Sequence, residues 1–485
     1  MSSPVLLPLH LNRVPHEVHH VHILGICGTG MAALAGMLKE QGFQVTGSDE
    51  NVYPPMSDFL ADSAIPVLHG YSPENLKQVP DLVVIGNVIR AVNPEVARIA
   101  ELEVPYVSMP QALSHFFLRD HTSIVVAGTH GKTTTSSLLA TALYDAGSSP
   151  GFMIGGIVEE FSRNYAIGQG RYFVVEGDEY DTAFFDKNSK FLRYHPDVAI
   201  ITSIEFDHAD IFTDLEMIKD SFRRFAAMVP EKGIIVACTD DPVIVDVVNC
   251  ATCPIVTYGT GEECDWRVDD FHPRALVSNF NVFHKDRFYG TFTIPMPGIY
   301  NALNATSVIA MMDHLGFSKD DIAISLASFQ GVKRRQQVRG EVNGITVIDD
   351  FAHHPTAVRA TVGALKSSWP DRRLVVVFEP RTNSSRRSVF QDQYARAFVN
   401  ADMTLIREHI PLDSIPADQQ FSSKKLVSDL VATGKSAYYF SETTGILDFL
   451  EDHAVSGDVI VILSNGGFDN IHERLLKRLV QHQIH

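Results

Sequence analysis

The sequence predicts an α/β fold made of several parallel sheets, and three observations support this class. Short runs of β-branched and aliphatic residues alternate with helical stretches along most of the chain. Two of these runs end in glycine-rich turns that lead into a helix, within residues 21–41 and 122–136. Several later runs end in acidic or amide side chains. Because ligands of open parallel sheets bind beyond the carboxyl ends of the strands, we expect the functional residues there.

The composition is that of a folded protein with two to four domains. The chain has 485 residues, of which 45% are apolar and 20% charged, and its formal charge is −18. That charge argues against a nucleic-acid partner, whose phosphates require clustered Lys and Arg. No apolar run is long enough to span a membrane, and residues 5–9 are too short and proline-broken for a signal peptide. We expect a cytoplasmic protein without nucleic-acid or membrane partners.

Five cysteines do not form a disulfide framework. Cys250 and Cys253 form a C-x-x-C with Cys238 and Cys264 on either side, so a zinc site is an alternative. The spacings fit no standard second pair, and Pro254 with its apolar neighbours is typical of a strand start. We therefore predict buried, inert thiols.

The first glycine-rich turn follows a predicted strand at 21–25 and precedes a helix and a strand at 44–47 that ends in Ser48-Asp49. A glycine turn with an acidic residue about 20 positions on holds a pyrophosphate and a ribose. The spacing is not G-x-G-x-x-G, because Cys27 stands at the second glycine position. A related diphosphate site is therefore favoured over a nicotinamide-dependent oxidoreductase. Strands at 82–85 and 106–108 complete a small doubly wound domain.

The second turn, Gly128-Thr-His-Gly-Lys-Thr133, follows a strand and opens a helix. Backbone N–H groups at a helix N-terminus bind anions, Lys132 can reach terminal phosphate oxygens, and the Thr133 hydroxyl can ligate Mg²⁺. The first glycine of the common phosphate loop would fall at Val126, so the match is imperfect. The alternative is an ordinary strand-to-helix turn.

Two further strands, within 172–181 and 198–210, end in carboxylates and a histidine. Hard oxygen ligands beside a phosphate loop suit a Mg²⁺-nucleotide centre, although each cluster alone is more often a solvated strand end. Asn301 precedes a helix and could cap it or bind an adenine edge, and its position alone favours the cap. The cationic run 333–335 is a solvated turn or a phosphate clamp.

A third α/β unit begins near residue 336, with strands expected at 345–348, 374–378, 403–406 and 459–463. Polar residues follow three of these strands, at 349–355, 379–386 and 464–467. This unit is therefore expected to present a binding face too. His353 and His354 could instead be a plain surface pair.

Three successive α/β units with this loop in the middle one resemble the Mur ligases, the ATP-dependent amide-forming enzymes of peptidoglycan synthesis. The family loop reads G-T-[HN]-G-K-T, as residues 128–133 do here. Further matches are Glu176, Glu205-x-Asp-His208, Asn301-x-x-Asn304, Arg335 and Asp350. The resemblance implies a Rossmann-like N-terminal domain at 1–118, a central P-loop ATPase domain at 119–335 and a Rossmann-like C-terminal domain at 336–485.

The resemblance also implies roles for individual residues. ATP would be bound by Gly128, Thr129, His130, Gly131, Lys132, Thr133, Thr134, Asn301, Arg335 and Asp350. UDP-N-acetylmuramate would be bound by Gly28, Thr29, Gly30, Met31, Asp49 and Asn87. Mg²⁺ would be held by Thr133, Glu176 and His208, and the catalytic set would be Lys132, Glu176, His208 and His353. A peptide would be bound by Arg381, Asn383, Ser464 and Asn465.

Within the family, two acceptors compete. Segments 177–190, 205–212, 378–383 and 464–469 resemble the branch that joins the murein tripeptide L-alanyl-γ-D-glutamyl-meso-diaminopimelate to UDP-N-acetylmuramate in recycling. The alternative acceptor is free L-alanine. Two departures are Tyr300, where many relatives have His, and Arg223-Arg224, in the region where several carry a carbamylated Lys. We expect a monomer or weak homodimer.

Overall fold

The computed structural model describes residues 4–207, 211–412 and 415–481, so His208 lies outside the described residues. The chain divides into two compact units. The first consists of Met1–Ile157, Phe161–Ile204 and Glu216–Thr257, and the second of Val158–Glu160, Glu205–Leu215 and Tyr258–His485. None of the helices in the described ranges combines the length and apolar character needed to cross a bilayer.

The first unit begins with a five-stranded parallel sheet in the order β3-β2-β1-β4-β5. Its strands are β1 (His20–Leu24), β2 (Gln44–Asp49), β3 (Val67–His69), β4 (Leu82–Ile85) and β5 (Tyr106–Ser108). Its helices are α1 (Thr29–Glu40), α2 (Met56–Asp62), α3 (Pro94–Leu102) and α4 (Met109–Leu113). The strand order reverses between β1 and β4, and ligands of such sheets bind at this reversal point, beyond the carboxyl ends of the strands.

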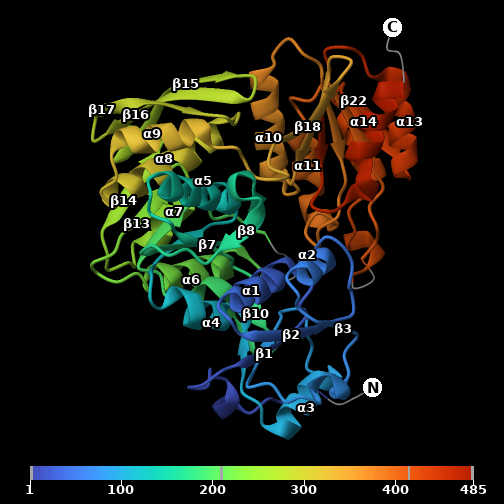
Figure 1. The fold of residues 1–485 in the computed structure, drawn as a ribbon. Helices are drawn as coiled ribbons and strands as arrows, with labels where there is room; N and C mark the ends of the chain where they lie inside the picture. The colour runs from blue at the N-terminus through green and yellow to red at the C-terminus, as the bar shows by residue number, and fades with distance from the viewer. Residues whose placement is uncertain (1–3, 208–210, 413–414, 482–485) are drawn as a thin grey trace. The chain divides into compact units, whose positions relative to one another are not determined.

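Both faces of this sheet are covered, which explains why every residue of β1 and β4 is buried, including His20 and His22. On one face, Leu24, Val83 and Ile85 pack with Val96 and Ile99 of α3. Helix α1 is buried throughout 31–38 because α2 and a strand of the next sheet also pack against it (Figure 1). A helix that is apolar on all sides is stable only when enclosed in this way.

The second sheet of the first unit has the order β13-β12-β6-β9-β7-β8. These strands are β6 (Thr122–Ala127), β7 (Gly151–Val158), β8 (Arg163–Ala166), β9 (Tyr172–Gly177), β12 (Val198–Ile201) and β13 (Ile235–Cys238). The pairs from β13 to β7 are parallel. The associated helices are α5 (Lys132–Asp145), α6 (Leu215–Ala226) and α7 (Pro242–Val248). A small hairpin of β10 (Asp181–Ala183) and β11 (Asp186–Ser189) follows β9, and the chain leaves the unit within β14 (Ile255–Gly259).

The second unit contains an antiparallel group of β15 (Trp266–Arg274), β16 (Val277–His284) and β17 (Arg287–Ile294). Lys285 and Asp286 both have positive φ, of 48° and 62°, as a two-residue hairpin turn requires. Helices α8 (Ile299–His314) and α9 (Lys319–Ser328) pack against this group (Figure 1).

The remainder of the second unit is a six-stranded sheet in the order β18-β19-β23-β20-β21-β22. Its strands are β18 (Gln337–Val342), β19 (Ile345–Asp350), β20 (Leu374–Phe378), β21 (Met403–Arg407), β22 (Ser436–Phe440) and β23 (Val459–Leu463). Only the edge strand β18 pairs in the antiparallel sense. Its helices are α10 (Pro355–Ser368), α11 (Gln391–Ala397), α12 (Ser423–Ala432), α13 (Thr443–His453) and α14 (Ile471–Gln481).

Alternating residues of β20 pack into two separate hydrophobic cores. Val376 and Phe378 pack with α10, α11 and α12, whereas Val375 and Val377 pack with α13 and α14. The period of two along a strand therefore places every residue of β20 in one apolar layer or the other. This explains the uninterrupted apolar run at 374–378.

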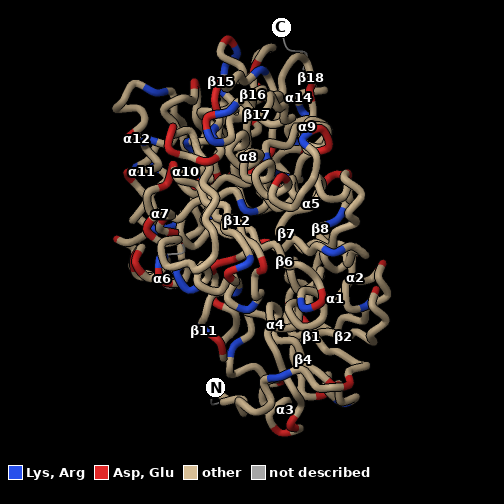
Figure 2. Tube along the Cα trace, turned by 90° about the vertical axis from the view of Figure 1, so that its left-hand side faces the viewer, with Lys and Arg blue, Asp and Glu red and all other residues tan. Residues whose placement is uncertain are grey.

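The strands expected from the sequence are confirmed, but the expectation that all thiols are buried is wrong. Cys238, Cys253 and Cys264 are buried, whereas Cys250 is exposed and Cys27 is partly exposed. Cys250 follows the end of α7, where the chain turns at the surface before β14. Figure 2 shows acidic and basic positions interspersed along the trace, without a long basic stretch.

Candidate active site

The predicted phosphate loop joins β6 to α5, and the segment after β12 holds it in place. The amide of Thr129 donates to the carbonyl of Ser203 (2.8 Å), and the amide of His130 donates to the Ser203 hydroxyl (2.9 Å). Gly128 has φ +140°, and a Cβ there would lie 2.2 Å from the Thr202 hydroxyl oxygen. The glycine is therefore required by the close approach of residues 202–203 to the loop.

Lys132 opens α5 and folds back over the loop. Its ammonium donates to the carbonyls of Gly128 (2.5 Å) and Thr129 (3.2 Å) and to the Glu179 carboxylate (2.9 Å). Burial disfavours the charged ammonium, but the carboxylates of Glu179, Asp178 and Glu176 outweigh burial and raise the pKa of Lys132. The side chain is thus a fixed cation at the mouth of the loop.

Thr133 and Glu176 form the candidate metal-binding pair. The Thr133 hydroxyl donates to one Glu176 carboxylate oxygen (2.9 Å), and the amide of Gly155 donates to the other (2.7 Å). The register between β6 and β9 pairs Val126 with Glu176, which brings the carboxylate to the end of β6. A hydroxyl and a carboxylate are hard oxygen ligands and fit Mg²⁺.

Two further acidic residues follow Glu176. Glu179 is almost fully buried beside Lys132, and the Asp178 carboxylate accepts a hydrogen bond from Lys190 (2.7 Å). Burial opposes ionisation of Asp178, but the charges of Lys190 and Lys132 prevail and hold its pKa below the ordinary range. Of Glu176, Asp178 and Glu179, only Glu176 was predicted from the sequence as a site residue. The acidic run 176–181 was the signal that could have indicated the other two.

The glycine-rich turn after β1 is held by Asp49. One Asp49 oxygen accepts the amide of Cys27 and the other accepts the amide of Asn51, each at 2.9 Å. Burial, together with the Asp49 charge, raises the pKa of the Cys27 thiol to about 11, so this cysteine stays protonated at neutral pH. The carboxylate that was expected to bind a ribose therefore already supports the turn.

The other residues predicted to bind the sugar nucleotide follow the carboxyl ends of β1 and β4. Gly28 precedes α1, Thr29 and Gly30 open it, and Met31 is buried in its first turn. Asn87 follows β4, and its side-chain amide donates to the carbonyl of Asp181 (3.1 Å). The turn after β1 and the segment after β4 thus lie at the reversal point of the strand order.

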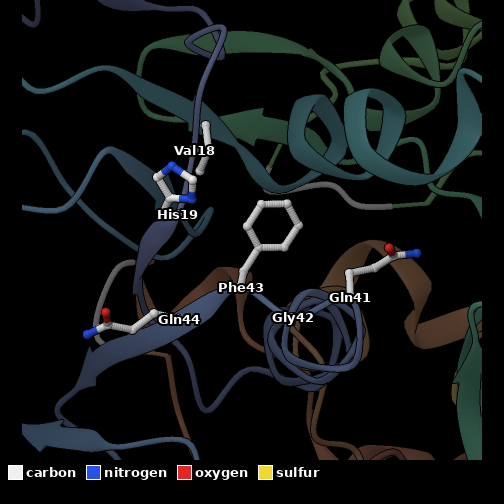
Figure 3. A pocket seen from close by; sticks show the side chains of 6 residues that line it. All are labelled: Val18, His19, Gln41, Gly42, Phe43 and Gln44. Carbon is white, nitrogen blue, oxygen red and sulfur yellow. The ribbon is translucent and has the colours of Figure 1, made fainter.

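A shallow cavity of about 430 Å³ lies at the other end of this sheet. Its lining residues are Val18, His19, Gln41, Gly42, Phe43 and Gln44 (Figure 3). Residues 18–19 precede β1 and residues 41–44 precede or begin β2, so the cavity is at the amino ends of the strands. The residues predicted to bind the sugar nucleotide, at the carboxyl ends, do not line it.

In the second unit, Gln336 links the predicted nucleotide-binding residues. Its side-chain oxygen accepts from the Asn301 amide (3.1 Å), its side-chain amide donates to the Tyr300 hydroxyl (2.7 Å), and its backbone amide donates to Asp350 (2.8 Å). Burial raises the pKa of Asp350, and the charge of Arg335 offsets this only in part. Sequence reasoning missed Gln336, which carried no signal beyond its place next to Arg335.

The interpretation of Asn301 as a helix cap is wrong. The N-cap of α8 is Gly298, and Asn301 lies within the first turn of the helix. Its buried amide donates instead to the carbonyl of Pro297 (2.8 Å) and to Gln336. The helix begins early because Gly298, with φ +103°, provides the reversal that starts it.

The predicted peptide-binding residues follow β20 and β23. Ser464 is buried, and its hydroxyl donates to Glu379 (2.6 Å). Arg381 packs over Gly466, where a Cβ would meet its Nε at 2.3 Å, and its guanidinium lies 3.7 Å from the Glu379 carboxylate. Arg381, Ser464 and Asn465 are therefore close together, whereas Asn383 lies further along its loop and accepts from Arg386 (3.3 Å).

His353 and His354 have different environments and are not a plain surface pair. His353 Nδ1 lies 3.0 Å from the carbonyl of Phe351, which selects the tautomer that carries a proton on Nδ1. His354 is buried, and its side chain caps α10 at the amide of Thr356 (3.4 Å).

Sequence models of three protein domains match the chain. The Mur ligase family catalytic domain matches residues 20–121, the Mur ligase middle domain matches 126–312, and the Mur ligase glutamate ligase domain matches 334–466. The chain belongs to the Mur ligase family. As a Mur ligase it has the three-part α/β architecture expected from the sequence, and this family assignment favours a ligase over the nicotinamide-dependent oxidoreductase.

Relatives of this Mur ligase match it along nearly its whole length. The UDP-N-acetylmuramate-L-alanyl-gamma-D-glutamyl-meso-2,6-diaminoheptandioate ligase of Escherichia coli is 38% identical over 464 residues, 95% of this chain and 98% of that protein. The UDP-N-acetylmuramate-L-alanine ligase of Geotalea uraniireducens is 33% identical over 464 residues, 96% and 98% of the two chains. The crystal structure of a murein peptide ligase from Psychrobacter arcticus is 36% identical, has a TM-score of 0.70, and the match covers 95% and 99% of the two chains.

Proposed function

We propose that this Mur ligase joins the tripeptide L-alanyl-γ-D-glutamyl-meso-diaminopimelate to UDP-N-acetylmuramate while it converts ATP to ADP and phosphate. The observation that carries the ATP-dependent chemistry is the grouping of Lys132, Thr133 and Glu176 beyond β6 and β9. The choice of acceptor rests on the E. coli relative, which is more similar than the L-alanine ligase and bears the tripeptide in its name.

The reaction begins with transfer of the γ-phosphoryl group to the lactyl carboxylate of the sugar nucleotide, which releases ADP and leaves an acyl phosphate. Lys132 and the loop amides would hold the β- and γ-phosphates in place, because positioning and charge stabilisation dominate phosphoryl transfer. Thr133 and Glu176 would hold Mg²⁺, which supplies neutralisation of the developing phosphate charge when bound. Asp49 and the turn at 27–30 would orient the UDP moiety.

The second step is attack by the free amine of the tripeptide on the acyl carbon, which forms the amide and expels phosphate. The attacking nitrogen must lose a proton, and we assign its acceptance to His353 Nε2. The Nδ1 proton is committed to the Phe351 carbonyl, which leaves Nε2 as the basic nitrogen. Asn301, Arg335 and Asp350 are assigned to the nucleotide, and Arg381, Asn383, Ser464 and Asn465 to the peptide.

The acceptor is tested by measuring ADP release with UDP-N-acetylmuramate and ATP fixed, while L-alanine, L-alanyl-γ-D-glutamate or the tripeptide is varied. We expect kcat/KM to be highest for the tripeptide. The second candidate, an L-alanine ligase, is favoured only by the 33% identity to such an enzyme. Preference for free L-alanine would reverse the assignment, and no acceptor-dependent ADP release would exclude both.

A further inference from the structure

Arg334, next to the predicted nucleotide-binding Arg335, is held in an unusual backbone conformation. Its φ is +63°, in the left-handed region that costs a non-glycine residue free energy. Its backbone is fixed on both sides, because its carbonyl accepts from the Phe351 amide (2.8 Å) and its amide donates to the Gln337 side chain (3.1 Å). Such a conformation persists only where the surroundings enforce it.

The guanidinium of Arg334 binds the backbone of the loop after β23. One terminal nitrogen donates to the carbonyls of Ser464 (2.5 Å) and Gly466 (2.7 Å), and Nε lies 3.6 Å from the buried carboxylate of Asp349. The side chain is only 30% exposed. A charged donor that bridges the carbonyls of residues i and i+2 fixes the path of the chain between them.

The loop held in this way carries the residues assigned to the peptide. Asn465 stands between the two bound carbonyls, and its side-chain oxygen is shielded from solvent without a hydrogen-bond partner among the described residues. Arg381 packs directly on Gly466. The positions of Asn465 and Arg381 therefore both depend on the course of residues 464–466.

We propose that Arg334 is a positioning residue for the acceptor peptide: it fixes the 464–466 loop so that Asn465 and Arg381 can bind the tripeptide. This inference rests on the proposed function. Arg335 differs, because its charge acts on Asp350 and Tyr300 of the nucleotide-binding group. The guanidinium carbons of Arg334 and Arg335 lie 5.2 Å and 4.8 Å from the Phe351 ring centroid, so the two side chains share one aromatic ring but act on different groups.

Arg339 provides a matched control. It is 31% exposed and binds the same Asp349 carboxylate at 3.2 Å, but its other ion-pair contact is Glu473. Removing its charge therefore also takes a cation from Asp349, while the carbonyls of Ser464 and Gly466 keep their donor. A difference in tripeptide KM between the Arg334 and Arg339 variants therefore reflects the contact of Arg334 with the 464–466 loop.

The test is steady-state ADP release by the full chain and by Arg334→Gln, Arg334→Lys and Arg339→Gln. We expect Arg334→Gln to raise KM for the tripeptide by about tenfold or more, because hydrogen bonds from a charged donor are lost. KM for ATP and for UDP-N-acetylmuramate should change by less than about twofold. Arg334→Lys should restore part of the loss, and Arg339→Gln should leave KM for the tripeptide unchanged.

Thermal unfolding of each variant shows whether it is folded, and Arg334→Lys keeps the test valid if Arg334→Gln is not. An unchanged tripeptide KM in a folded Arg334 variant would overturn the inference, as would an equal rise in Arg339→Gln. A fall in kcat with all KM values unchanged indicates a merely structural role and would overturn it too. If the wild-type chain shows no tripeptide-dependent ADP release, the proposed function fails first, and the inference fails with it.

Discussion

The Lys132 ammonium lies 2.9 Å from the Glu179 carboxylate, and both side chains are largely buried. In this arrangement Glu179 supplies the negative charge that a nucleotide phosphate would otherwise supply to Lys132. Because a buried cation without a counter-ion is costly, Glu179→Gln should lower the free energy of unfolding by about 1–3 kcal/mol. This loss of stability should be smaller in the presence of saturating ADP, because a phosphate of ADP can then replace the Glu179 carboxylate as the counter-ion of Lys132.

Thermal or urea unfolding of wild type and Glu179→Gln, with and without ADP, measures this difference. The high pKa of Lys132 means that its charge, and the stability it contributes, persist below its ordinary pKa of 10.5 and are lost as pH rises through the folded value. An equal loss of stability with and without ADP would show that Glu179 and phosphate do not share Lys132.

Lys132→Ala should lower tripeptide-dependent ADP release by about 10²–10⁴-fold, because a fixed charge on the transferred phosphoryl group is lost. Binding of UDP-N-acetylmuramate to the full chain should be unaffected, as followed by calorimetry. Lys187→Ala is the control, since Lys187 is a 70% exposed lysine paired with Asp181 in the neighbouring hairpin. Retention of full activity by Lys132→Ala would exclude the phosphate-loop assignment.

Glu176→Gln should raise the Mg²⁺ concentration needed for half-maximal ADP release by about tenfold, because the charged oxygen facing Thr133 becomes neutral. Titration of activity with MgCl₂ at fixed ATP measures the change. The fold should be retained, since a Gln side-chain oxygen can still accept from the amide of Gly155. An unaltered Mg²⁺ dependence would remove Glu176 from the metal site.

Gly128→Ala should destabilise the protein by about 2–4 kcal/mol, because its Cβ would overlap the Thr202 hydroxyl in addition to the strain of φ +140°. Gly147→Ala is the control. Gly147 has φ +78° but open space around the added Cβ, so about 1 kcal/mol of backbone strain is expected there. Urea unfolding measures the loss of stability in each variant. Equal losses in Gly128→Ala and Gly147→Ala would mean that contact with Thr202 is unimportant.

Stability at acidic pH should depend on Asp349. Burial opposes its ionisation, but contact with His472 and the charges of Arg334 and Arg339 hold its pKa below the ordinary 3.8. Its contribution is therefore present above about pH 4 and is lost as pH falls through the folded pKa. Asp349→Asn should flatten the fall in urea midpoint between about pH 5 and 3. Asp269→Asn is the control, because Asp269 is 52% exposed and its ion pair is screened.

The sequence predicted the strands well because burial on both sheet faces leaves a strong signal. Every residue of β20 and β23 is buried, so both segments read as unbroken apolar runs. The loop between β6 and α5 was predictable because Gly128, Gly131 and Lys132 lie within one short stretch of the chain and need no long-range information.

Other parts of the site depend on contacts that the sequence does not encode locally. Glu179 lies beyond the end of β9, so strand register does not reveal that it reaches Lys132. Gln336 bonds to Tyr300, Asn301 and Asp350 while its own backbone is in the left-handed conformation, with φ +50°. Asparagine is a common helix-capping residue, but α8 begins before Asn301, with Gly298 as its N-cap.

Because there is no room for a side chain at position 128, a glycine there does not show that a related chain binds a nucleotide. Thr202 and Ser203 exclude a side chain there whether or not a nucleotide is ever bound. A descendant that had lost its catalytic activity would still need glycine at this position to fold. Lys132 is different, because without a nucleotide its ammonium serves only the ion pair with Glu179, and these two charges can be lost together. In searching genomes for inactive versions of this fold, replacement of the lysine is therefore the informative sign, and survival of the glycine is not.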